Sequence, residues 1–258
     1  QVFFKWYGRQ YGRVLNCFTH FFVQNEISKE LLAKIGITNT TVVGDTRFDR
    51  VLQIKEAAKQ LPIVESFVKD APQVFVAGSS WPPDEEIFIK YFNEHKNWKL
   101  IIAPHVIGED HLKQIEKLLE GRKVIRYTEA EKMVNGQLSM VNDYEVLIIN
   151  CFGLLSSIYH YGNVAYVGGG FGVGIHNLLE AAVWDVPVFF GPNNLKVQEA
   201  QGLKTSGGFE ISSYEDFAAQ MDRFAADDAY LQEQGQKAGH FVKGQSGATQ
   251  KVLSAVAL

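Results

Sequence analysis

Residues 165–192 read A-Y-V-G-G-G-F-G-V-G-I-H-N-L-L-E-A-A-V-W-D-V-P-V-F-F-G-P, and this stretch decides the fold. The apolar run from Val164 to Val167 has the composition of a short buried strand, and a glycine-rich loop follows it directly. The pattern then predicts a helix over 175–184 and a second buried strand over 186–190. A strand, a loop, a helix and a second strand in this order form a βαβ unit, whose strands are parallel.

The glycine loop and the helix expected after it have the properties of a phosphate-binding site. Glycines let the backbone come close to a ligand, and the start of a helix directs N–H groups at an anion. Polar residues share one face of the expected helix, where a carboxylate one turn in is well placed to accept hydrogen bonds from ribose hydroxyls. The residues of this candidate site are Gly168, Gly169, Gly170, Gly172, Gly174, His176, Asn177 and Glu180.

The loop departs from two well-known nucleotide-binding patterns. Its glycines do not follow the G-x-G-x-x-G order of dinucleotide-binding proteins, and no acidic residue ends a following strand at the usual offset. No G-K-[ST] follows, as it would in a Walker loop. A sugar nucleotide therefore fits better than a dinucleotide or ATP. The alternative is a glycine-rich turn without a ligand, which explains the glycines but not the polar residues after them.

Length and composition are those of an ordinary globular protein. Of the 258 residues, 46% are hydrophobic and 21% are charged, and the net charge of −4 argues against nucleic acid as the main partner. We expect a soluble chain, because no apolar run approaches the roughly 18 residues of a membrane span. Cys17 and Cys151 stand in apolar contexts that predict reduced thiols. No cluster has metal-ligand spacing, so we expect neither a metal nor a cofactor.

From residue 73 onward, strand and helix patterns alternate regularly. This alternation predicts an α/β fold with a doubly wound, mainly parallel sheet, in which ligands bind outside the carboxyl ends of the strands. Strands are expected at 73–77, 99–103, 123–126, 146–149, 164–167, 186–190 and 208–211. Helices are expected at 84–96, 109–120, 153–161, 175–184, 195–203, 213–226, 228–243 and 246–257.

Three other strand ends supply further candidates for the same site. Two serines after the first strand have the hydroxyls to contact a phosphate, with capping of the next helix as the alternative. A Pro-His pair after the second strand is placed to form a wall for a base or a sugar, with a structural histidine as the alternative. A lysine and a glutamate after strand 186–190 either reach the same crevice or form an exposed charge pair. These residues are Ser79, Ser80, Pro104, His105, Lys196 and Glu199.

The first 72 residues follow a different pattern. Residues 2–16 predict a basic, aromatic amphipathic helix, which either packs on another domain or lies on a membrane surface. A strand at 20–24, a helix at 26–35 and a strand at 41–43 follow. Because the chain begins inside a helical pattern, we interpret it as part of a longer protein. The expected segments are the end of a preceding domain over 1–50, a linker over 51–72, a ligand-binding domain over 73–245 and a C-terminal helix over 246–258.

Six motifs occur in order along the chain and resemble those of one family. They are Gln24-Asn25-Glu26, V-G-D-T-R-F-D at 43–49, A-G-S-S-W-P-P-D-E-E at 77–86, I-A-P-H at 102–105, the block from Tyr166 to Glu180, and Pro187 to Glu199. They are similar to A-Q-N-E, T-G-x-x-K-F-D, S-T-H-x-G-E-E, V-P-R-H, F-V-G-G-S…G-G-H-N-x-L-E and P-V-x-x-G-P-x-x-x-N-F-x-[DE]. Those belong to the 3-deoxy-D-manno-octulosonic acid (Kdo) transferases of lipopolysaccharide synthesis, here in a Bacteroides-like form.

The resemblance implies the C-terminal half of a GT-B glycosyltransferase, an architecture of two Rossmann-like domains. In that family the C-terminal domain binds the donor, CMP-Kdo, and the N-terminal domain binds a lipid A precursor at the cytoplasmic face of the inner membrane. The family's proposed catalytic base is a glutamate in an S-V-G-E motif, which these 258 residues lack. We therefore expect this chain to bind the donor and to be inactive alone, with base, acceptor and membrane contacts in a missing N-terminal segment.

The sequence departs from the family pattern at four places. Trp81 replaces the histidine of S-T-H, and Pro104-His105 lacks the arginine of P-R-H. Asn150 stands where the family has the aspartate of D-T-x-G-E, and Ile175 replaces the second glycine of G-G-H-N. These changes leave the donor open. The alternatives are a UDP-sugar transferase or epimerase of the same architecture, and a non-catalytic module that binds sugar nucleotides.

Overall fold

The chain forms two compact units. The computed structural model describes residues 4–8, 12–119, 121–133, 138–172 and 174–256. The larger unit is Gln53–Val242, and the smaller unit combines Gln1–Leu52 with Lys243–Leu258. The larger unit contains every candidate site residue that the sequence predicts.

The larger unit is built on a parallel sheet. In its described residues the sheet has seven strands in the order β5-β6-β4-β3-β7-β8-β9. Every neighbouring pair is parallel, as the alternation of strands and helices predicts. The strands are β3 Gln73–Ser80, β4 Trp98–Pro104, β5 Val124–Arg126, β6 Val146–Ile148, β7 Val164–Val167, β8 Val188–Phe190 and β9 Gly208–Glu210.

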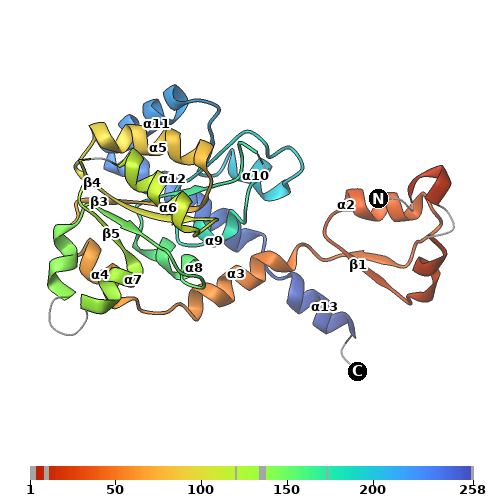
Figure 1. Ribbon diagram of the computed structural model, residues 1–258. Coiled ribbons are helices and arrows are strands. Elements are labelled where there is room, and N and C mark those ends of the chain that lie inside the picture. The colour runs from red at the N-terminus through yellow and green to blue at the C-terminus, as the bar shows by residue number, and fades with distance from the viewer. Residues whose placement is uncertain (1–3, 9–11, 120, 134–137, 173, 257–258) are drawn as a thin grey trace. The chain divides into compact units, whose positions relative to one another are not determined.

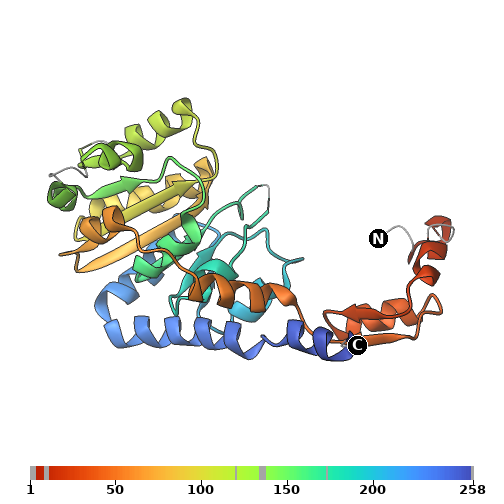
Figure 2. The ribbon, with the colours of Figure 1, turned by 90° about the horizontal axis from the view of Figure 1, so that it is seen from below.

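Helices cover both faces of this sheet (Figures 1 and 2). On one face α5, α6 and α11 pack on a core that includes Phe75 and Ala77 of β3. Val74 and Val76 alternate with these residues and are buried on the other face, where α4, α8 and η6 lie. Two-sided burial explains why the strands are continuously apolar instead of alternating with polar residues.

The long helices of this unit lie close to the expected ranges, whereas several shorter helices differ from them. Its long helices are α5 Pro82–Glu94, α6 Glu109–Leu118, α11 Tyr214–Ala226 and α12 Asp228–Gly244, the last of which continues into the smaller unit. The shorter elements are α4 Pro62–Val68, α7 Tyr127–Ala130, η4 Glu131–Met133, η5 Leu138–Asp143, α8 Leu155–Ile158, η6 Tyr159–Tyr161, α9 Leu179–Ala182 and α10 Gln198–Leu203.

The smaller unit holds a pair of parallel strands. Strand β1 is Phe21–Val23 and strand β2 is Thr40–Val42, with α2 Glu26–Ala33 between them. Asn25 caps α2 by accepting a hydrogen bond from the Ser28 N–H at 2.8 Å. The unit also contains the start of α3 Thr46–Glu56, and α13 Ala248–Val256. The carboxylate of Asp49 on α3 accepts the N–H groups of Gly247 and Thr249, so it ties the start of α13 to α3.

The described residues do not form one continuous amphipathic helix over 2–16. They include a bend at Lys5, the 3-10 turns η2 Trp6–Gly8 and η3 Arg13–Cys17, and Gly12 in a helical conformation before η3. Gly8 ends the first turn and Gly12 precedes the second, and glycine disfavours a helix by about 1 kcal/mol relative to alanine. Residues 2, 3 and 9–11 of the expected helix lie outside the described residues.

The segment expected as a linker, residues 51–72, contains helices. It contains the end of α3 and the whole of α4, and it buries Ile63, Val64 and Phe67 of that helix completely or almost completely. Apolar side chains at helical spacing explain the packing. The division into domains at these boundaries stays a prediction.

Candidate functional site

Three loops meet at the carboxyl edge of the sheet, as the sequence predicts. Strand β3 pairs with β4 on one side and with β7 on the other, so the loops that leave these strands are neighbours. The Gly168 N–H donates to the Gly78 carbonyl at 2.9 Å, and the His105 N–H donates to the Ser80 carbonyl at 2.9 Å. The strand order therefore brings together residues that are far apart in the sequence.

The glycines after β7 are required by the packing of the protein on itself. A Cβ atom on Gly168 would lie 2.3 Å from the carbonyl oxygen of Ser79, and one on Gly170 would lie 2.6 Å from the backbone of Gly191. Gly169 has a φ of +93°, which side chains other than glycine rarely adopt. Gly172 differs, because a Cβ atom there would meet nothing within 4 Å.

Most of the glycine amides in this loop already have acceptors in the protein. The N–H of Gly169 donates to the carboxylate of Asp84, and the N–H groups of Gly172 and Gly174 donate to the Gly169 carbonyl. These three amides are therefore engaged within the protein, and their role in holding a phosphate stays a prediction. Side chains of the neighbouring loops can supply other donors to a phosphate at this edge.

The helix after the loop is shorter than expected. It begins at Leu179 instead of residue 175, because the chain first folds back so that the His176 N–H donates to the Gly168 carbonyl. His176 and Asn177 therefore lie before the helix and do not share a helical face with Glu180. Asn177 still meets Glu180, since its side-chain N–H donates to Glu180 Oε1 at 3.0 Å.

A buried aspartate that was not among the predicted site residues holds the glycine loop in place. Asp84 is completely buried at the start of α5. Its Oδ2 accepts the N–H groups of Gly169 and Trp81, both at 2.9 Å, and its Oδ1 accepts the hydroxyl of Tyr166 at 2.7 Å. Burial raises the pKa of this carboxyl, although these hydrogen bonds act in the opposite direction.

The two serines after β3 have different environments. Ser80 is buried, and its hydroxyl donates to Glu85 Oε1 at 2.8 Å, so it supports the loop and does not face a ligand. Ser79 is half-buried, with a φ of +52° that is uncommon for a residue with a side chain. Backbone strain of this kind is concentrated at functional sites. Ser79 therefore stays a candidate for ligand contact.

A buried glutamate and a half-buried histidine form a pair next to the loop after β4. His111 Nδ1 donates to the Val106 carbonyl at 2.8 Å, and its Nε2 lies 2.8 Å from Glu85 Oε2. Since Nδ1 carries a proton, the contact with Glu85 requires a second proton on one of the two partners. Burial raises the pKa of Glu85. The pair fixes the backbone of the loop that carries His105.

Three aromatic rings line the edge between the loops. The Trp81 and His105 rings stack with centroids 4.7 Å apart, and the His105 and His176 rings stack at 4.5 Å. Beside them, a cavity of about 120 Å³ is lined by Trp81, Pro83, Asp84, Gly169, Phe171 and Gly172. The structure thus brings together His105 and His176, which the sequence predicted from separate motifs. Pro104 is buried at the end of β4, where it shapes the turn into His105.

The loop after β8 supports the glycine loop from the other side. Its Asn193, which the sequence analysis missed, donates its backbone N–H to the Gly170 carbonyl at 2.8 Å and its side-chain N–H to the Gly172 carbonyl at 2.9 Å. Lys196 is exposed whereas Glu199 is buried, so the alternative of an exposed charge pair is wrong. The sequence alone gave little reason to select Asn193, because asparagine is common in loops.

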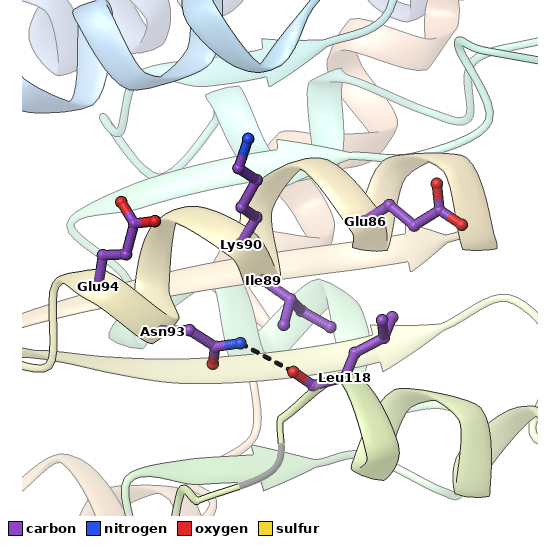
Figure 3. A pocket seen from close by; sticks show the side chains of 6 residues that line it. All are labelled: Glu86, Ile89, Lys90, Asn93, Glu94 and Leu118. Carbon is purple, nitrogen blue, oxygen red and sulfur yellow. Dashed lines mark hydrogen bonds between the residues drawn. The ribbon is translucent and has the colours of Figure 1, made fainter.

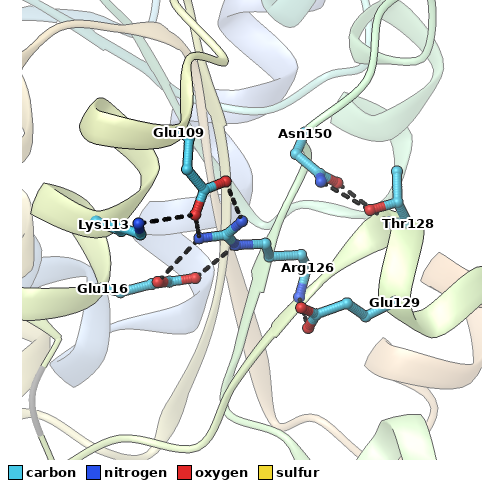
Figure 4. A network of polar contacts seen from close by, with 7 residues as sticks. All are labelled: Glu109, Lys113, Glu116, Arg126, Thr128, Glu129 and Asn150. Carbon is cyan, nitrogen blue, oxygen red and sulfur yellow. Dashed lines mark hydrogen bonds and ion pairs between the residues drawn. The ribbon is translucent and has the colours of Figure 1, made fainter.

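Asn150, which stands in place of a family aspartate, has a structural role in the polar network of Figure 4. Its side chain donates to Thr128 Oγ1 at 2.8 Å and accepts the Thr128 N–H at 3.1 Å. An aspartate at this position could accept hydrogen bonds but could not donate one to Thr128. In the same view Arg126 is paired with Glu116 and Glu109, which raise the pKa of its guanidinium.

A second hollow is lined by helices instead of strand ends (Figure 3). It encloses about 360 Å³ and includes no residue that the sequence predicts for the site, so we do not assign a ligand to it. Its lining residues are Glu86, Ile89, Lys90, Asn93, Glu94 and Leu118.

In the described residues, no group of three or more acidic, histidine or cysteine side chains is placed to hold a metal ion. No helix of the described chain is long and apolar enough to cross a membrane.

Solved structures show which fold the chain has. The C-terminal CMP-Kdo binding domain of WaaA from Acinetobacter baumannii matches with a TM-score of 0.55 and 17% identity, over 76% of this chain and 97% of that domain. A putative UDP-N-acetylglucosamine 2-epimerase from Listeria monocytogenes matches with a TM-score of 0.59 and 12% identity, over 90% of this chain and 57% of that protein. The chain has the Rossmann-like fold of the C-terminal half of a GT-B glycosyltransferase.

Three sequence relatives illustrate what the chain is similar to. The chain is 33% identical over 153 residues to a 3-deoxy-D-manno-octulosonic acid transferase from Aquifex aeolicus, which covers 57% of this chain and 40% of the relative. It is 27% identical over 196 residues to the same enzyme from Chlamydia trachomatis, covering 74% and 43%. A bifunctional glycosyltransferase/methyltransferase from Fusobacterium nucleatum is 28% identical over 215 residues, covering 78% and 32%.

The chain is therefore similar in sequence to several Kdo transferases, and its fold is similar to that of the WaaA domain. It spans less than half the length of each of the three relatives. No protein-family model matches the sequence. The resemblance to Bacteroides-like members stays a prediction.

Proposed function

We propose that this chain is the donor-binding part of an enzyme that transfers Kdo from CMP-Kdo to a lipid A precursor in lipopolysaccharide synthesis. The observation that carries the proposal is the stacking of His105 on His176 at the carboxyl edge of a parallel sheet, in a chain similar in sequence to Kdo transferases. Ligands of such sheets bind at this edge. The full-length protein would act at the cytoplasmic face of the inner membrane.

Glu180 is the proposed ribose contact. Asn177 donates to its Oε1, which orients the carboxylate and leaves Oε2 to accept hydrogen bonds from the ribose hydroxyls. The side chain is half-buried, so it is accessible from the edge of the sheet. Fixed orientation lowers the entropy cost of binding a nucleotide.

The departing phosphate is the part of the reaction that this chain would stabilise. In an inverting transfer the acceptor hydroxyl attacks the anomeric carbon, the bond to the CMP phosphate breaks, and a general base takes the hydroxyl proton. Because the glycine amides have protein acceptors, we assign the phosphate to the side chains of Ser79, His176 and Lys196. The base and the acceptor contacts are proposed for other parts of the full-length protein.

Nucleotide selectivity tests this proposal. The thermal unfolding of the purified chain is measured with CMP, UDP and AMP at equal concentrations. We expect CMP to stabilise the chain most, by about 2.7 kcal/mol when its concentration is a hundred times its dissociation constant. A larger stabilisation by UDP would favour the UDP-sugar alternative. Stabilisation by none of the three would contradict a nucleotide site at this edge.

A further inference from the structure

Trp81 makes a directional contact with His176 that the proposed function does not use. The indole Nε1 of Trp81 lies 3.3 Å from His176 Nε2, and both side chains are half-buried. An indole N–H can only donate a hydrogen bond, so His176 Nε2 has to be the acceptor. An accepting Nε2 carries no proton, which leaves the single ring proton of a neutral imidazole on Nδ1.

The surroundings of His176 favour the same neutral ring. Burial is the main cause that lowers the pKa of His176. His105, which stacks on it from the loop after β4, lowers this pKa further. Asp84 at the start of α5 acts in the opposite direction. On the segment of His176 itself, the charged group that faces the edge is Glu180, whose Oε1 is bound by Asn177.

Trp81 is itself held firmly, so it can direct its neighbour. Its backbone N–H donates to Asp84 Oδ2 at 2.9 Å, and its ring stacks on His105 with an interplanar angle of 22°. The hydrogen bond holds the backbone of Trp81, and the stacking on His105 holds the plane of its ring. A ring without an N–H would preserve the stacking and lose only the hydrogen bond to His176.

We propose that Trp81 is a positioning residue that holds His176 as the neutral tautomer protonated at Nδ1. The site thereby presents an uncharged hydrogen-bond donor to the phosphate or the sugar of the nucleotide. The tautomer depends only on the protein, whereas its use by a ligand rests on the proposed function. The closing experiments separate the two.

The tautomer is tested on the chain without any ligand. Two-bond ¹H–¹⁵N NMR spectra identify which ring nitrogen of His176 carries the proton, and a pH series follows its titration. We expect Nδ1–H in the native protein, and in Trp81→Phe a rise in the pKa of His176 with partial protonation of Nε2. Trp184→Phe is the matched control, because the Trp184 indole donates to the Ser156 carbonyl at 2.9 Å and not to a histidine.

The native spectrum by itself can overturn the proposal. A His176 ring protonated at Nε2 at neutral pH would contradict it, even if Trp81→Phe failed to fold. An unchanged titration in a folded Trp81→Phe variant would contradict it as well, because it would assign the low pKa to burial and His105 alone.

The consequence for binding is measured by calorimetry with CMP at pH 8 and pH 6. We compare the CMP affinity of Trp81→Phe, divided by that of native protein, at the two pH values. This ratio should be roughly fivefold to tenfold higher at pH 6 than at pH 8, because His176 is then charged in the variant, and a charged donor binds phosphate about 1 kcal/mol better than a neutral one. A constant ratio would contradict a role of the tautomer in binding. Absence of CMP binding in the native chain would instead reject the proposed function, while the NMR result still decides the tautomer.

Discussion

Two carboxylates lie at the same edge of the sheet and differ in how their oxygens are used. Both oxygens of Asp84 are bound by protein donors, and the residue is completely buried. Glu180 is half-buried and receives one side-chain hydrogen bond, from Asn177. A carboxylate whose hydrogen bonds are satisfied inside the protein holds the fold, whereas one with an exposed oxygen is available to a ligand.

The largest effect should come from removing the satisfied carboxylate. Asp84→Ala leaves two backbone N–H groups and the Tyr166 hydroxyl without their acceptor. Unsatisfied buried groups cost about 1–3 kcal/mol each, so we expect a loss of roughly 3–5 kcal/mol in the free energy of unfolding, measured in urea. Asp84→Asn keeps an acceptor for the amides and should lose clearly less. Equal stability of Asp84→Ala and native protein would remove the distinction between the two carboxylates.

A second test separates packing glycines from a glycine with open space. Gly170→Ala places a Cβ atom 2.6 Å from the Gly191 backbone and should destabilise the larger unit by roughly 1–3 kcal/mol. The matched variant, Gly172→Ala, meets nothing within 4 Å and should change stability by less than about 0.5 kcal/mol. Urea unfolding of the pair measures the difference. Similar stability of the two variants would contradict the close approach of these loops.

The available carboxylate should affect binding and not folding. Glu180→Gln keeps the shape of the side chain and removes its charge, so the hydrogen bonds to ribose hydroxyls weaken. We expect CMP affinity to fall about ten- to a hundredfold, which corresponds to roughly 1.5–3 kcal/mol. Calorimetry measures the affinity and thermal unfolding checks the fold, with the exposed Glu215→Gln as control. Unchanged CMP affinity would remove Glu180 from the site.

The smallest effect is a pH dependence of opposite sign at two aspartates. The folded chain holds the proton of Asp84 to higher pH than the unfolded chain does, so this residue makes stability fall as pH rises above the ordinary aspartate pKa of 3.8. Asp49 in the smaller unit has a lowered pKa, because although burial raises it, hydrogen bonds from Gly247 and Thr249 outweigh burial. Its contribution is present above pH 3.8 and is lost as pH falls further.

Denaturation of two variants between pH 3 and pH 7 checks these signs. The stability difference between native protein and Asp84→Asn should become less favourable to the native protein as pH rises. The same difference for Asp49→Asn should become less favourable as pH falls. If both stability differences changed in the same direction with pH, the opposite pKa shifts of Asp84 and Asp49 would be contradicted.

Much of the fold could be predicted from the sequence, because it depends on local patterns. Apolar runs bounded by turns predicted each strand of the large sheet, and their alternation with helices made the strands parallel. Parallel strands in turn place the loops with His105 and His176 at one edge. The first expected helix was less well predicted, because the described residues there form short 3-10 turns that the apolar spacing alone did not indicate.

Only the tertiary structure decided which hydrogen-bond partners the residues at the carboxyl edge of the large sheet have. Asp84 and Gly169 are 85 positions apart, and they meet because β3 and β7 are neighbours in a strand order that chain order alone does not predict. The glycines pack on other loops instead of presenting their amides, and the loop that returns to Gly168 delays the helix until Leu179. Local patterns determine which residues are buried or turned, whereas hydrogen-bond partners depend on which distant segments the sheet places side by side.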